Sequence, residues 1–257
     1  MNRIQRAFSS GKAFIPFITG GDPDLETTVK LLYALNEAGA DLIEIGIPFS
    51  DPIAEGPVIE AADERAIKAG CTVDDLFDIV SRVRTDIETP ILFMTYYNPV
   101  FVYGLSDFTR LSAECGLDGI IVPDLPFEER DELMKFCVSS GLDLISLISP
   151  TSEERIEKIA KNSSGFLYCV SSLGVTGTRN ELGDSACRMI EQAKQVTDIP
   201  CAVGFGISTP EQAKEMVAIA DGVIVGSAIV KIIAAYGREC IEPVRSFAKS
   251  IKQAISK

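Results

Sequence analysis

Short apolar runs alternate with longer amphipathic segments along the whole chain. Apolar runs of about four to eight residues bounded by Gly, Pro, Asp or Asn are typical of buried strands, and longer segments with apolar residues every three or four positions are typical of helices. The runs predict eight strands, at residues 14–19, 42–47, 91–96, 119–122, 144–148, 166–170, 201–205 and 222–225.

The segments between these runs carry helix signals. Residues 24–38 predict a helix that ends before Gly39 and has one apolar stripe, formed by Leu25, Val29, Leu32 and Leu35. Capping boxes predict two further helix starts, at Thr151 with Glu154 and at Thr209 with Gln212; in the second, Pro210 takes the favoured first position.

Strands that alternate with crossover helices predict a parallel sheet. Eight such units in 257 residues favour one (β/α)8 barrel domain of the TIM type over residues 1–257, and a doubly wound open sheet is the alternative. The long gap after the second strand has room for extra helices at residues 58–69 and 73–84.

The second predicted strand contains an acid. Alternation along a strand places Ile43, Ile45 and Ile47 on one face and Glu44 on the other, beside Leu42. If both faces are covered, burial raises the pKa of Glu44 toward neutrality, which suits proton transfer. The alternative is a buried acid that is satisfied by hydrogen bonds and has no catalytic role.

Composition narrows the class of protein. A formal charge of −13 disfavours nucleic acid and anionic membranes as partners. The seven cysteines are scattered and lack any C-x-x-C spacing, which indicates thiols in a reducing cytoplasm. The sequence has neither an apolar signal region at its start nor an apolar run long enough to span a membrane.

The chain contains no histidine, which removes Ser-His-Asp and Cys-His mechanisms and most catalytic zinc sites. Acid–base chemistry therefore falls to Asp, Glu, Tyr, Lys or Cys. No lysine falls at an inner strand end, so a Schiff-base aldolase is disfavoured, and a metal-dependent aldolase would have only carboxylates as ligands.

Glycine-rich turns follow the last two predicted strands, at residues 204–208 and 225–228. In a (β/α)8 barrel this position commonly binds phosphate, because backbone N–H groups and a helix N-terminus favour an anion. The alternative is that the glycines only form tight turns. The residues thus favour acid–base chemistry by two carboxylates, Glu44 and either Asp51 or Glu55, on a phosphorylated substrate.

The whole chain resembles the tryptophan synthase α subunit family. The most specific segment is E-I-G-I-P-F-S-D-P-I-A-E-G-P at residues 44–57. Supporting motifs occur in family order: P-F-I-T-G-G-D-P at 16–23, Y-Y-N-P at 96–99, P-D-L-P at 123–126, G-V-T-G at 174–177, G-F-G-I at 204–207 and V-G-S-A at 225–228.

The resemblance implies reversible retro-aldol cleavage of indole-3-glycerol phosphate to indole and glyceraldehyde 3-phosphate, without a cofactor in this chain. It makes Glu44 the general acid/base and Glu55 the acid that stabilises positive charge on the indole nitrogen. Thr176 would close over the substrate. The substrate-binding residues that it implies are Phe17, Tyr168, Thr176, Gly177, Phe205, Gly206, Gly226 and Ser227.

The resemblance also implies a partner, the β subunit that contains PLP, in an α2β2 assembly. The residues that match the partner-facing loops are Asp51, Asn98, Pro99, Asp124 and Pro126. In one position the chain departs from the family, because the second acid is ordinarily aspartate and Glu55 is one methylene longer. A regulatory subunit that binds the substrate but cleaves it weakly, and another phosphate-binding barrel isomerase, are the alternative functions.

Overall fold

The computed structural model describes residues 1–170, 179–204 and 206–256. Eight parallel strands form a closed barrel in sequence order, β1 to β8, with β1 paired to β8, and the predicted (β/α)8 architecture is confirmed. The strands are β1 Ala13–Thr19, β2 Ile43–Gly46, β3 Ile91–Met94, β4 Gly119–Ile121, β5 Asp143–Ile148, β6 Leu167–Val170, β7 Cys201–Gly204 and β8 Gly222–Val225.

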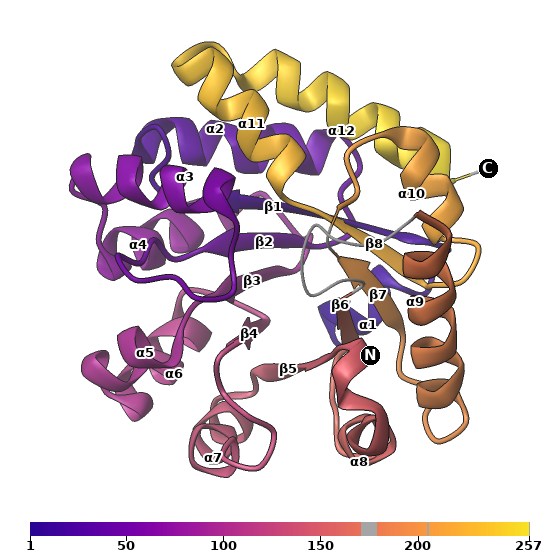
Figure 1. Cartoon of the computed structure of the whole chain (residues 1–257). Helices are drawn as coiled ribbons and strands as arrows, with labels where there is room; N and C mark the ends of the chain where they lie inside the picture. The colour runs from indigo at the N-terminus through magenta and orange to yellow at the C-terminus, as the bar shows by residue number, and fades with distance from the viewer. Residues whose placement is uncertain (171–178, 205, 257) are drawn as a thin grey trace.

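Helices surround the strands (Figure 1). The α-helices are α1 Arg3–Ala7, α2 Leu25–Glu37, α3 Pro57–Lys68, α4 Val73–Val83, α5 Tyr97–Tyr103, α6 Leu105–Glu114, α7 Asp131–Ser140, α8 Ile156–Lys161, α9 Arg179–Lys194, α10 Pro210–Met216, α11 Ser227–Tyr236 and α12 Ile241–Ile255. Two short 3-10 helices are η1 Pro150–Arg155 and η2 Gly237–Glu239. The two helices expected between β2 and β3 are confirmed as α3 and α4.

Most of the local predictions hold. Asp24 caps α2, whose inward stripe includes Val29, Leu32 and Leu35, and Gly39 follows it with a φ of 90°. Thr209 accepts a hydrogen bond from the Gln212 N–H in a capping box, as predicted.

The helix start predicted at Thr151 is wrong. Ser149 is the cap, it forms its box with Ser152, and the segment that follows is the 3-10 helix η1. Ser149, Thr151 and Ser152 are all of residue types that can cap a helix. Pro150 favours Ser149 as the cap, because it then takes the first helical position.

The strands have two apolar faces. Ile43, Ile45 and Ile47 point outward and pack under the helices. Residues of the opposite face fill the barrel interior, among them Leu42, Leu92, Ile121 and Phe166. Helix α1 covers the amino ends of the strands, since its Ile4 and Ala7 belong to the same interior cluster. The carboxyl ends of the strands therefore offer the interior to a ligand.

Candidate functional site

Glu44 lies in the barrel interior, on β2 between Phe17 of β1 and Leu92 of β3. It is fully buried, and neither of its carboxyl oxygens has a hydrogen-bond partner among the described residues. Burial raises its pKa to about 8. A carboxyl with this pKa holds a proton at neutral pH and releases it at little cost, so it can serve as both acid and base.

Two aromatic rings lie near Glu44. Phe17 is its neighbour on β1, and Tyr168 points inward from β6. Two glycines leave room for these rings, because a Cβ on Gly46 would come within 2.6 Å of Phe17 Cζ and a Cβ on Gly204 within 2.6 Å of Tyr168 Oη. Burial and the nearby charges of Glu44 and Glu55 raise the pKa of Tyr168, so its phenol stays neutral beside both acids.

Glu55 lies in the loop between β2 and α3. Tyr96, at the end of β3, fixes this loop, because its hydroxyl accepts hydrogen bonds from the N–H of Ile53 at 3.1 Å and of Ala54 at 2.9 Å. The Glu55 Oε2 atom is buried and has no hydrogen-bond partner among the described residues. Burial raises the pKa of Glu55, and the charge of Glu60 raises it further.

Asp63 is another buried acid at this end of the barrel, and it was not among the predicted site residues. It lies on α3 with 3% of its surface exposed. Its carboxyl is hydrogen-bonded to Glu55, and burial together with the charge of Glu55 raises its pKa to about 8. An acid beside Ala62 and three residues before Ala66, on the inward stripe of α3, is the sequence signal that could have revealed it.

The predicted phosphate end lies after β7 and β8. Gly226 caps α11, and its carbonyl accepts hydrogen bonds from the N–H of Ile229 and of Val230. The N–H groups of Ser227 and Ala228 belong to the first turn, which has no intrahelical acceptors, so they suit an anion. Gly206 has a φ of 80°, which favours glycine. Thr176, Gly177 and Phe205 lie outside the described residues.

The residues predicted to face a partner lie in the loops and helix that follow β2, β3 and β4. Asp51, Asn98 and Pro126 are exposed, while Pro99 and Asp124 are half-buried. Asp124 Oδ1 accepts a hydrogen bond from the Tyr97 N–H at 2.9 Å, which ties the β4 loop to α5. Large apolar side chains are exposed in the same region, at Ile53, Phe101 and Val102.

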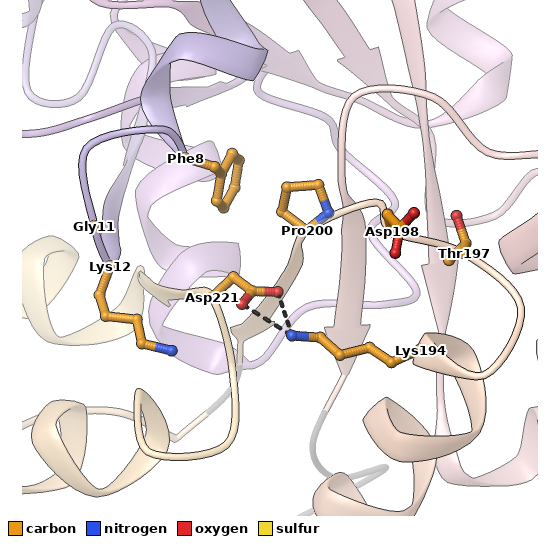
Figure 2. Close-up of a pocket in the computed structure, with 8 residues that line it drawn as sticks. All are labelled: Phe8, Gly11, Lys12, Lys194, Thr197, Asp198, Pro200 and Asp221. Atoms are coloured by element: carbon orange, nitrogen blue, oxygen red, sulfur yellow. Dashed lines mark hydrogen bonds and ion pairs between the residues drawn. The ribbon is translucent and has the colours of Figure 1, made fainter.

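A cavity of about 530 Å³ lies at the opposite end, beside the first residues of β1, β7 and β8 (Figure 2). Three of its charged groups have partners: Lys194 forms an ion pair with Asp221 at 2.8 Å, and Lys12 donates a hydrogen bond to the carbonyl of Ala220. The amino ends of barrel strands serve stability rather than chemistry. This cavity is therefore not the active site.

No helix formed by the described residues is long and apolar enough to cross a membrane. Within the same part of the chain, no group of three or more Cys, Asp and Glu side chains could hold a metal ion.

The fold and the site define a class of protein: a (β/α)8 barrel with buried carboxyl groups at the carboxyl ends of its strands, an arrangement that suits acid–base chemistry. Comparison with known proteins then gives the family. A family model described as tryptophan synthase alpha chain matches residues 5–256. The chain is 49% identical to the tryptophan synthase alpha chain of Lacticaseibacillus casei, over 99% of this chain and 96% of the relative, and 48% identical to that of Synechocystis, over all of both chains.

Solved structures agree with the sequence comparison. The tryptophan synthase subunit alpha of Legionella pneumophila superposes with a TM-score of 0.90 at 40% identity, covering 100% of this chain and 99% of that one. A chain of the tryptophan synthase complex of Pyrococcus furiosus superposes with a TM-score of 0.85 at 36% identity, covering 95% and 99%. The chain belongs to the tryptophan synthase alpha chain family, and the expected enzyme class, a carbon–carbon lyase, is confirmed.

Proposed function

We propose that Glu44 is the general acid/base with which this chain performs its lyase reaction, the reversible cleavage of indole-3-glycerol phosphate to indole and glyceraldehyde 3-phosphate. The observation that carries this role is a fully buried carboxyl in the barrel interior whose two oxygens have no hydrogen-bond partner among the described residues. A purely structural acid at such a position would be hydrogen-bonded, because leaving a buried polar group unpaired is costly.

The reaction needs a proton at one carbon and the loss of a proton from one oxygen. Neutral Glu44 gives its proton to indole C3, and the resulting carboxylate then takes the proton of the side-chain hydroxyl. The bond between C3 and the hydroxyl-bearing carbon breaks, its electrons return to the indole ring, and the C–O bond becomes the aldehyde C=O. Glu44 ends protonated, so a pKa of about 8 suits both steps.

Glu55 supplies negative charge where the indole nitrogen becomes positive. Its buried Oε2 atom supports this role, because no described residue forms a hydrogen bond with it and it can accept one from an N–H donor. Phe17 and Tyr168 border the ring, and the first turn of α11 with Gly226 and Ser227 binds the phosphate. Thr176, Gly177, Phe205 and Gly206 complete the substrate-binding set as predictions from the resemblance.

The chain acts with a tryptophan synthase β subunit, which carries the PLP, while the α chain has no cofactor of its own. A solved structure of the tryptophan synthase α2β2 complex from Pyrococcus furiosus gives the structural basis of mutual activation in that complex. We propose that Asp51, Asn98, Pro99, Asp124 and Pro126 face this partner, because the exposed apolar residues Phe101 and Val102 lie in the same region. The seven scattered cysteines, which lack any C-x-x-C spacing, support a cytoplasmic location. We also propose that residues 1–257 act as one barrel domain.

Indole release from indole-3-glycerol phosphate, with and without a β subunit, tests the proposal. Glu44→Gln keeps the shape of the side chain but cannot carry the proton, so turnover should fall by about 10²-fold or more while substrate binding stays nearly intact. Turnover above about a tenth of the wild type would reject Glu44 as the proton carrier.

Glu55→Gln tests the second role in the same assay. Removal of its negative charge should lower kcat much more than it raises KM, since the charge is needed once the indole nitrogen is positive.

If the wild type releases no indole yet stimulates the β reaction, the chain is the regulatory subunit instead.

A further inference from the structure

Asp63 is a buried acid that the lyase reaction does not by itself explain. It is one of three buried residues of α3, and the other two, Ala62 and Ala66, are apolar. Three groups from other parts of the chain lie close enough to its carboxyl to shift its pKa: the Glu55 carboxyl, the backbone N–H of Phe49 and the hydroxyl of Thr19. The side chain thus lies where α3, β1 and the loop that carries Glu55 meet.

The surroundings of Asp63 contain no described cation that would neutralise a pair of negative charges. Arg65, two residues further along α3, is bound to Asp22 through two hydrogen bonds of 2.8 and 2.7 Å. Helix α3 packs against β1, which has no charged residue, and against α11, whose only charged residue, Lys231, is exposed. The titratable groups that face Asp63 are Glu55 and Tyr96.

We propose that Asp63 is a positioning residue that keeps one proton between its own carboxyl and that of Glu55, so that Glu55 presents one charged, unpartnered oxygen to the indole nitrogen. The inference rests on the proposed role of Glu55. It adds a residue, a proton and a hydrogen bond that fix how Glu55 is oriented.

Two carboxyl groups in hydrogen-bond contact cannot both be ionised without strong repulsion, and together they retain one proton. Asp63 is the more buried of the two, and burial and the charge of Glu55 raise its pKa to about 8. The proton therefore resides mainly on Asp63, whose O–H donates to Glu55. We assign this bond to Oε1 of Glu55, so that Oε2, which is buried and has no hydrogen-bond partner among the described residues, is left for the substrate.

The pairing also gives a reason for the longer acid at this position. Glutamate carries its carboxyl about 1 Å farther from the backbone than aspartate does, and a displacement of this size matters when geometry sets the rate. The loop is held at Ile53 and Ala54 by Tyr96, so the length of the side chain decides whether the carboxyl reaches Asp63.

Two substitutions separate this role from space filling. Asp63→Asn keeps a hydrogen-bond donor to Glu55 but cannot ionise, whereas Asp63→Leu fills similar space without a donor. Indole release should fall by no more than about fivefold for Asn and by about 50-fold for Leu, mostly in kcat, because a misplaced Glu55 fails in the transition state. Glu64→Gln, an exposed neighbour on α3, is the matched control and should have no effect.

The dependence of kcat/KM on pH is a second measurement, and a purely structural role of Asp63 would leave it unchanged. Above pH 8, log(kcat/KM) of the wild type should fall with pH with a slope of two, because Glu44 and Asp63 each lose a proton. For Asp63→Asn the slope should be one, because only Glu44 loses a proton. Equal effects of Asn and Leu, or an unchanged slope, would overturn the role of Asp63.

The Glu55 variant separates the two proposals. If Glu55→Gln lowers turnover while Asp63→Asn and Asp63→Leu behave alike, only the role of Asp63 fails. If Glu55→Gln leaves turnover intact, the proposed function of Glu55 fails first.

Should Asp63→Leu not fold, infrared spectroscopy locates the proton directly. In a Glu44→Gln background, which removes the other neutral buried acid, a neutral carboxyl C=O band should be present at pH 7, titrate away near pH 8 and vanish in Glu44→Gln/Asp63→Asn. Absence of that band from the Glu44→Gln protein at pH 7 would contradict the proposal.

Discussion

Three partly buried acids at the amino ends of the barrel strands are held differently from Glu44 and Glu55 at the carboxyl ends. At the amino ends Asp41, Asp118 and Asp221 each accept a hydrogen bond from a backbone N–H at the start of a neighbouring strand, at 2.7, 3.0 and 2.9 Å. Each is also paired with a cation: Lys252 at 2.6 Å, Arg84 at 3.1 Å and Lys194 at 2.8 Å. At the carboxyl ends, Glu44 and Glu55 have no described cationic partner.

This difference separates acids suited to stabilising the fold from the acids that we propose perform the chemistry. A carboxylate with an N–H donor and a cation stays charged and joins the start of one strand to the next. A buried carboxyl without them keeps its proton to high pH, which opposes folding at neutral pH but is useful to a reaction. Substitutions at the two ends should therefore have opposite consequences for stability and turnover.

The largest effect on stability is expected at Asp118. Its carboxylate holds Arg84 and Arg3 and accepts the Ile91 N–H, and the side chains of Asp118 and Arg84 are each only 10% exposed. Asp118→Ala leaves a buried guanidinium unpaired, so it should lower the free energy of unfolding by about 3–5 kcal/mol, measured by denaturant titration, with kcat unchanged. A decrease in the free energy of unfolding of less than about 1 kcal/mol would contradict the structural role assigned to Asp118 at the amino end.

Glu55→Asp should have the next largest effect, and on turnover rather than stability. The shorter side chain withdraws its carboxyl from both Asp63 and the substrate, so kcat/KM for indole release should fall by about 10- to 100-fold. The free energy of unfolding should change little. A faster variant would instead mean that the natural glutamate is a defect in a weakened enzyme.

A smaller effect is expected from Tyr96→Phe, which removes only the hydroxyl that holds the Glu55 loop. The N–H groups of Ile53 and Ala54 lose their acceptor, so stability should fall by about 1 kcal/mol and kcat/KM by roughly tenfold. Asp118→Asn, at the other end of the barrel, is the comparison: it should cost stability without a change in turnover. Full activity of Tyr96→Phe would show that the loop does not depend on this hydroxyl.

Much of the fold could be predicted because burial imposes periodicity. The eight strands were located to within one or two residues at each end, and the outward face of β2 follows from the alternation of Ile43, Ile45 and Ile47. The predicted helix start at Thr151 failed because capping depends on which of several nearby hydroxyl residues adopts the extended conformation, and that residue is Ser149.

The site was only partly predictable for a similar reason. Glu44 could be found because an acid inside an apolar strand has no exposed face to occupy. Asp63 and the anchoring role of Tyr96 could not, since each depends on contacts between segments far apart in the sequence. The paired acids at the amino ends were missed for the same reason. The roles of Glu44, Glu55 and the substrate-binding residues stay predictions until the assays above are done.

We expect Glu44 to be kept neutral for chemistry at the expense of stability. The pKa of Glu44 is raised by burial from 4.5 to about 8, so both states are protonated below pH 4.5, and between pH 4.5 and 8 only the unfolded chain releases the proton. This release favours unfolding, and the contribution of Glu44 to stability is therefore lost as the pH rises to about 8.

The most direct measurement is the free energy of unfolding of the wild type and of Glu44→Gln at pH 5 and at pH 8. From the lower to the higher pH the wild type should lose roughly 3 kcal/mol more than Glu44→Gln, because glutamine has no proton to release. The same loss in both proteins would mean that Glu44 is already charged in the folded chain, and would contradict its role as a neutral acid.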